Sequence, residues 1–199
     1  MLTNIIFNLL GVLVFLFLYW KKFKEDFPTS LIFSSAFYIL TGIFLGIIIS
    51  HFLFPSGWFW LAFVGASVAL IISVFRFHLK LYETIESATI SLLPWLSLVF
   101  FNNAVTTSLP TSFLATVFCV LLIILFLFLD SHYRSFTWYS SGKVGFSGLS
   151  ILGIFFLARA ILAIFPLNVI SFVKVETFVS GIISLVLFFS VYKLSKQKV

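Results

Sequence analysis

Residues 112–129 read SFLATVFCVLLIILFLFL, an apolar run without a charged side chain that ends at Asp130. A helix needs about 20 predominantly apolar residues to cross the hydrocarbon core of a bilayer, so this run predicts a transmembrane helix. The whole chain has the same character: 62% of its 199 residues are hydrophobic, only 9% are charged, and the mean hydropathy is +1.23. Soluble domains carry about 25% charged residues. The sequence therefore predicts an integral membrane protein.

Polar residues divide the chain into seven apolar segments, each about as long as a membrane span. Pro94 interrupts the fourth segment. No basic segment precedes the first, which favours a mature helix over a cleaved signal peptide. All loops are short and no internal repeat is visible. We therefore expect residues 1–199 to form a single transmembrane domain, an all-α polytopic membrane helix bundle with about seven transmembrane helices. The expected spans are Thr3–Trp20, Ser30–Phe54, Trp58–Phe75, Ile85–Phe101, Ser112–Leu129, Val144–Phe165 and Thr177–Tyr192.

The basic residues predict the orientation of this bundle. When the connections between spans are sorted into two alternating sets, ten basic residues fall in one set and only Lys174 in the other, while Arg159 lies within a span. Positively charged loops are retained on the cytoplasmic side of a membrane. An odd number of spans then places Met1 outside and Val199 inside. The ten residues are Lys21, Lys22, Lys24, Arg76, Lys80, Arg134, Lys143, Lys193, Lys196 and Lys198.

Few residues of the types that carry catalysis or bind cofactors are present. Cys119 lies inside an apolar run, so no disulfide framework is expected. His51, His78 and His132 lie near span ends on both sides of the membrane, so we expect no metal site, and no motif implies a cofactor. The basic residues form no stripe interleaved with aromatic residues, which argues against nucleic acid as a partner.

Two carboxylates lie close together near the start of the fourth span. Glu83 and Glu86 are three positions apart and so share one face of a helix. A solvated helix start, where the helix dipole favours acidic side chains, accounts for them. We expect no catalytic role for this pair.

Arg159 is the most informative single residue. An arginine within a span costs at least about 2.5–3.5 kcal/mol on insertion scales, so it normally faces a cavity, a partner or a lipid headgroup. It could form a structural ion pair or extend to the nearby interface. It could instead bind the phosphate of an anionic lipid, which a guanidinium fork suits well. Glu176 is the only acidic residue on the expected outer side, and this scarcity of counter-ions favours an external anion.

Glycines mark the expected contacts between helices. Gly42 and Gly46 form a GxxxG pattern in the second span, and Gly145, Gly148 and Gly153 recur in the sixth. Such glycines let two helix backbones approach closely. We expect helix contacts at Gly46, Gly148 and also Gly65 of the third span.

The order of these features resembles that of a known family. Residues 145–159 read GFSGLSILGIFFLAR and resemble the glycine-rich helix, ending in an essential arginine, of the bacterial prolipoprotein diacylglyceryl transferases. The resemblance implies a seven-span enzyme of the bacterial cytoplasmic (inner) membrane with its N-terminus outside. That family transfers the diacylglyceryl group of phosphatidylglycerol to the lipobox cysteine of prolipoproteins. The resemblance also implies a cavity, open laterally to lipid, among spans two, three, four and six.

Further segments resemble the family in order and spacing but differ at its polar positions. Residues 40–46, 60–66, 92–95 and 109–112 follow family segments. Ile48 and Phe101 stand where the family has arginines, Val64 where it has a histidine, and Ala115 where a glutamate follows. Apolar side chains cannot transfer protons or stabilise a departing phosphate.

The resemblance implies a set of lipid-binding residues: Arg159, Asn102, Asn103 and Gly65. The implied partners are membrane phospholipid and the signal peptides of prolipoproteins. Because the polar groups are replaced, we expect binding of a phosphatidylglycerol-type lipid with weak or no transfer. The alternative is a non-enzymatic lipid-binding protein or assembly partner. A small transporter is a weaker alternative, because paired charges inside the spans and inverted repeats are not visible.

Overall fold

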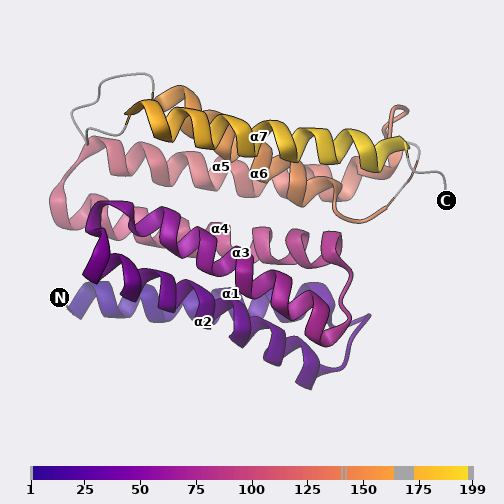
Figure 1. Cartoon of the computed structure of the whole chain (residues 1–199), viewed down its shortest axis with the longest axis horizontal. Coiled ribbons are helices and arrows are strands. Elements are labelled where there is room, and N and C mark those ends of the chain that lie inside the picture. Colours follow the sequence, from indigo (N-terminus) through magenta and orange to yellow (C-terminus); the bar gives the residue numbers. More distant parts are fainter. Residues whose placement is uncertain (1, 140, 142, 164–172, 197–199) are drawn as a thin grey trace.

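The computed structural model describes residues 2–139, 141, 143–163 and 173–196 of the chain. This part of the chain is helical, with two short 3-10 turns and no strand, so the protein is an all-α bundle (Figure 1). The helices are α1 (Leu2–Phe23), α2 (Thr29–Leu53), α3 (Trp58–Phe77), α4 (Leu81–Thr107), α5 (Pro110–His132), α6 (Phe146–Leu162) and α7 (Val173–Lys196), and the turns are η1 (Pro55–Gly57) and η2 (Tyr133–Ser135).

The helices are those of a multi-pass membrane protein. Six of them, all except α6, are long and apolar enough to cross a membrane. The described helix α6 has 17 residues and is apolar but shorter. Each of the seven predicted segments thus contains a helix, and residues 164–165 of the sixth lie outside the described residues. The count of seven spans and the orientation stay predictions.

Pro94, which interrupts the apolar pattern of the fourth segment, does not interrupt the helix. Pro94 lies inside α4, and the helix continues on both sides of it from Leu81 to Thr107. Proline removes one backbone hydrogen bond from a helix, but neighbouring helices can compensate for this inside a membrane bundle. α4 also extends beyond the expected segment, Ile85–Phe101, at both ends.

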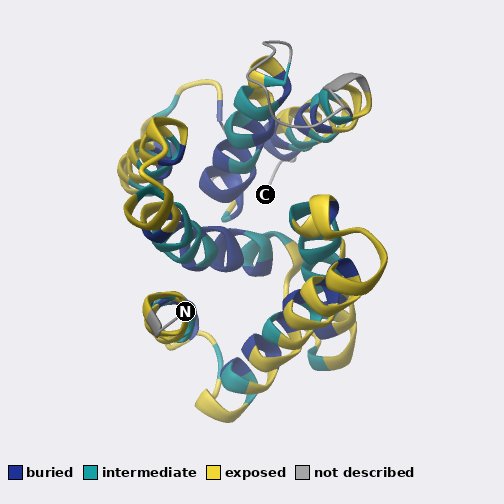
Figure 2. Ribbon diagram, turned by 90° about the vertical axis from the view of Figure 1, so that its left-hand side faces the viewer, coloured by how far each residue is buried: buried dark blue, intermediate teal, exposed yellow. Residues whose placement is uncertain are grey.

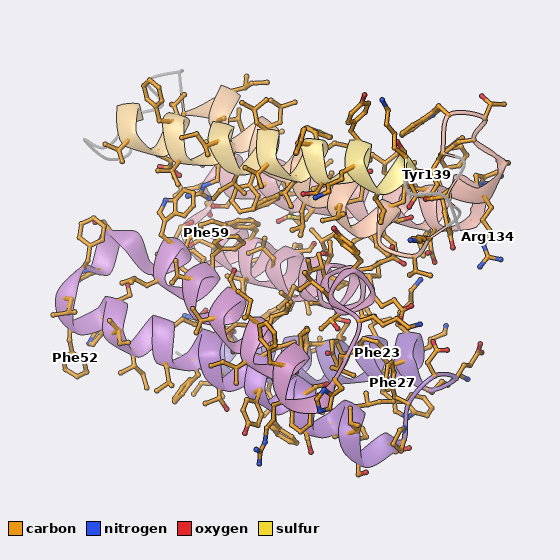
Figure 3. All side chains as sticks on the ribbon, turned by 45° about the vertical axis from the view of Figure 1, so that its right-hand side comes forward. Phe23, Phe27, Phe52, Phe59, Arg134 and Tyr139 are labelled. Atoms are coloured by element: carbon orange, nitrogen blue, oxygen red, sulfur yellow. The ribbon has the colours of Figure 1, made fainter. Side chains whose placement is uncertain are left out.

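The helices run along a common axis and alternate in direction, so the bundle has two distinct ends (Figure 1). α1, α3, α5 and α7 finish at the same end, which we call the basic end because Lys22, Lys80, Arg134 and Lys196 lie there. Figure 3 shows Arg134 at this end and Phe59 at the opposite one. We call the opposite end the Arg159 end, since α6 finishes there.

α4 is the central helix. Half of its most apolar stretch is buried, against 11 to 33% in the other five long helices. It packs along α1 and α5 and also contacts α6, whereas α2 packs mainly on α3 and α6 on α7. The outward faces of the surrounding helices are exposed (Figure 2), as expected where lipid rather than water covers apolar side chains. Side chains on α4 can therefore contact several neighbouring helices.

Close helix contacts occur at the predicted glycines. A Cβ atom added to Gly65 would lie 2.1 Å from the backbone oxygen of Gly42, so α2 and α3 touch backbone to backbone. Gly46 approaches the α3 backbone in the same way. A Cβ on Gly148 would lie 2.5 Å from the Cα of Glu86, which joins α6 to α4. The expected contacts at Gly46, Gly65 and Gly148 are confirmed.

Candidate functional site

Arg159 lies in the last turn of α6 and is held by two neighbouring helices. Its Nη2 atom forms an ion pair with the Oε1 atom of Glu176, in the first turn of α7. The guanidinium carbon lies 3.9 Å from the ring centroid of Phe59 and 5.4 Å from that of Trp60, both at the start of α3. A guanidinium over aromatic faces gains a cation–π attraction in addition to its ion pair. The cation is thus stabilised by α3 and α7 together.

This geometry corrects the argument from missing counter-ions. The sequence analysis favoured an external anion as the partner of Arg159. In the structure Glu176 is the counter-ion, so Arg159 has a partner within the protein. The two side chains are 26% and 31% exposed, which leaves the pair accessible from outside the bundle. The Nε atom of Arg159 is buried and has no hydrogen-bond partner among the described residues. Arg159 is therefore neutralised in charge but not saturated in hydrogen bonds.

The other expected lipid-binding residues contact different parts of the bundle. Asn102 donates a hydrogen bond from its Nδ2 atom to Asn4 of α1. Asn103 donates to the Oγ atom of Ser112, on α5, at 2.8 Å. Gly65 packs against α2, as described above. The described contacts thus place these residues and Arg159 at separate interfaces, and one shared lipid pocket stays a prediction.

A second charged site, at the basic end, was missed by the sequence analysis. Lys22 Nζ lies 2.8 and 2.9 Å from the two carboxylate oxygens of Asp130 and 3.1 Å from Glu86 Oε1. The backbone N–H of Gly145 donates to Glu86 Oε2 at 2.8 Å. Three spans and the start of α6 therefore meet around one lysine and two carboxylates.

Glu86 differs most from its expected environment. It is only 1% exposed, so its interpretation as part of a solvated helix start is wrong. Ser87 and Ala88 follow it, and Gly148 lets α6 approach closely enough to cover it. The small residues beside Glu86 were the sequence signal that another helix could pack closely over this carboxylate. The sequence did not show that α6 is the helix that packs on this part of α4.

A cavity of about 470 Å³ opens next to this cluster. Its walls come from the ends of α1 and α5, the start of α4 and the connections beside them. Figure 3 shows Phe23 and Arg134 of this wall at the same end of the molecule. None of the wall belongs to α2 or α3, so this is not the lateral cavity expected from the resemblance. The lining residues are Lys21, Lys22, Phe23, Glu25, Asp26, Glu83, Glu86, Ser87, Asp130, Ser131, Tyr133, Arg134 and Val144.

Metal binding finds no support in the described part of the chain, where no group of three His, Cys, Asp or Glu side chains is arranged to hold an ion. Compared with protein-family models, curated proteins and solved structures, the chain matches none. The resemblance to the diacylglyceryl transferases therefore stays a prediction from the sequence.

Proposed function

We propose that this chain is a divergent relative of the prolipoprotein diacylglyceryl transferases of the bacterial inner membrane. In this proposal it binds a phosphatidylglycerol-type lipid at the Arg159 end and transfers its diacylglyceryl group weakly or not at all. The observation that carries the proposal is the placement of Arg159: a partly exposed guanidinium at the end of α6, set on the Phe59 ring. Aromatic rings at this level suit the interface between acyl chains and headgroups.

The ion pair with Glu176 is compatible with a bound phosphate. A guanidinium has five N–H donors in a planar fork, and the described contact with Glu176 uses one of its terminal nitrogens. An anionic headgroup could bind the remaining terminal donors while the Phe59 ring supports the face of the fork. Glu176 would then compete with the lipid phosphate for Arg159, which makes its removal an informative test.

The weakness of transfer follows from the surroundings of three other positions. Ile48, Val64 and Phe101, which stand where the family has polar groups, are 36%, 51% and 40% exposed on the bundle. Apolar side chains that face outward supply neither a proton acceptor nor a donor for a departing phosphate. Loss of one charge-stabilising donor typically slows a reaction by about 100- to 1,000-fold. Of the three side chains described above around Arg159, Phe59 and Trp60 are aromatic, and Glu176 is the one carboxylate.

The test compares lipids on the purified protein in detergent micelles. We expect phosphatidylglycerol to bind more tightly than phosphatidylcholine with the same acyl chains. Arg159→Gln should remove this preference, and Arg159→Lys should restore part of it because the charge returns without the fork. Glu176→Gln should strengthen phosphatidylglycerol binding by removing the competing carboxylate. Lys193→Gln, which removes an exposed cation at the other end, is the matched control and should change nothing.

Two results would overturn the proposal. Equal binding of the two lipids by the wild-type protein, or an unchanged preference in Arg159→Gln, would exclude the headgroup role and favour the non-enzymatic assembly partner. Rapid diacylglyceryl transfer to a lipobox peptide would show that other residues have taken over the chemistry.

A further inference from the structure

The cavity at the basic end has a mixed and unequal charge. Five carboxylates and three cationic side chains line it, so acidic groups exceed basic ones by two. Its volume of about 470 Å³ lies within the range of about 300–1,000 Å³ that is typical of small-molecule sites. A lining of this kind attracts a ligand that carries a positive group and also tolerates a negative one.

The internal ion pairs do not satisfy all of these carboxylates. Glu86 Oε1 and Glu83 Oε2 are buried oxygen atoms without a hydrogen-bond donor among the described residues. Lys22 Nζ forms an ion pair with Glu86 Oε1 at 3.1 Å, while its shorter contacts, at 2.8 and 2.9 Å, are with the two oxygens of Asp130. The Glu86 side chain is only 2% exposed. Buried carboxylate oxygens without hydrogen-bond donors are costly, and an N–H donor on a ligand would reduce this cost.

The lack of hydrogen-bond donors to these two carboxylate oxygens indicates the chemistry of a ligand for this cavity. A primary ammonium carries three N–H donors and a positive charge. It therefore suits two buried carboxylate oxygens that lack a hydrogen-bond donor, Glu83 Oε2 and the ion-paired Glu86 Oε1. Lys21 and Arg134 line the same cavity and offer cationic donors for an anion. Both charges together form a zwitterion with an ammonium and a phosphate. The cavity also lies at the ends of three membrane-spanning helices, at the level where lipid headgroups are found.

We propose that this cavity binds a zwitterionic group with a primary ammonium and a phosphate, as in an ethanolamine phospholipid headgroup or free phosphoethanolamine. The ammonium contacts Glu86 and Glu83, and the phosphate contacts Lys21 and Arg134. This site is independent of the proposed lipid site at Arg159, since the two lie at opposite ends of the bundle.

The test uses the full-length protein, freed of lipid, in detergent micelles. Native mass spectrometry compares phosphatidylethanolamine with phosphatidylcholine, whose trimethylated ammonium has the same charge but no N–H donor. We expect the ethanolamine lipid to bind at least about 10-fold more tightly, as the loss of one charge-assisted hydrogen bond or more predicts. A second arm adds free phosphoethanolamine and follows the melting temperature. Stabilisation in this arm indicates a soluble ligand, and lipid preference alone indicates a headgroup; either supports the shared chemistry.

Substitutions locate the site. Glu86→Gln and Glu83→Gln should each reduce the preference to less than about 3-fold. Glu83 pairs with the exposed Lys80, so its variant is expected to fold even where Glu86→Gln does not. Lys193→Gln, which removes an exposed cation outside both proposed lipid sites, is the control and should keep the preference. The proposal is overturned by equal binding of the two lipids together with no effect of phosphoethanolamine. A preference that survives both cavity substitutions overturns it as well.

Discussion

Lys22 and Asp130 are 108 positions apart in the chain, and the lysine ammonium contacts both oxygens of the carboxylate at 2.8 and 2.9 Å. This contact joins the last turn of α1 to the last turns of α5. Glu86 of α4 lies on the other side of the same ammonium, at 3.1 Å. One side chain of α1 thus contacts α4 and α5, two helices that lie far from α1 in the sequence.

Lys22→Met should destabilise the bundle because it leaves Glu86 and Asp130 close together without their cation. Removing one partner of a fully buried ion pair costs about 3–5 kcal/mol. Lys22 and Asp130 are 27% and 30% exposed, so solvent screening should reduce the loss to about 1–3 kcal/mol. Thermal unfolding in micelles measures it. The double variant Lys22→Met/Glu86→Gln should recover part of the loss, and a double variant no more stable than the single one would contradict the coupling.

Gly145→Ala should be strongly destabilising. Gly145 has a φ of 117°, which L residues rarely adopt, and an added Cβ would lie 2.6 Å from the Cβ of Tyr82. Strain of this kind costs about 1–3 kcal/mol, and the displaced backbone would also weaken the N–H bond to Glu86. Gly181→Ala is the control: it meets nothing within 4 Å inside α7, so stability should rise slightly. Equal melting temperatures for the two variants would refute this account.

Asn102→Leu should have a small effect on stability. The amide of Asn102 joins α4 to Asn4 of α1, and hydrogen bonds between membrane helices average about 0.6 kcal/mol, with about 1.7 as the largest values. We expect a loss within that range, measured by unfolding in micelles. Phosphatidylglycerol binding measured on the same variant separates a structural role from lipid contact. A loss well above 2 kcal/mol would mean that the interface depends on this amide far more than its geometry indicates.

The orientation can be tested by labelling single cysteines in intact cells after replacing Cys119, which is fully buried. Cysteines at Lys80 and Lys196 should react only with reagents that enter the cytoplasm. Those at Ser56 and Thr107 should react with impermeant reagents from outside. Labelling of Ser56 and Lys80 from the same side would show that α3 does not cross the membrane.

The helices could be predicted from sequence because their signal is local. An apolar run such as residues 112–129 must satisfy its backbone hydrogen bonds internally in lipid, whatever its neighbours are. The glycine contacts followed from the same kind of local rule. The expected fourth span runs across Pro94, and α4 is one continuous helix there.

The charged sites could not be predicted in this way because they depend on which helices meet. Glu86 has the sequence context of an exposed helix start, and only the packing of α6 through Gly148 buries it. Arg159 and Glu176 were both identified, but their ion pair depends on how α6 and α7 lie against each other. The partner of a charge inside a bundle is a property of the tertiary structure.

The separation of Lys22 from its partners sets an order for the insertion of this protein during synthesis. α1 reaches the bilayer before Glu86 and Asp130 have been translated, so Lys22 must first be solvated by water and headgroups at the membrane edge. α2 and α3 can pair meanwhile, because their contact is local in the sequence. The ammonium gains both carboxylates only after α5 has entered, and Glu86 gains its backbone donor only when Gly145 follows. The contacts around this lysine therefore cannot be complete until Gly145, the last of these residues in the chain, has been synthesised.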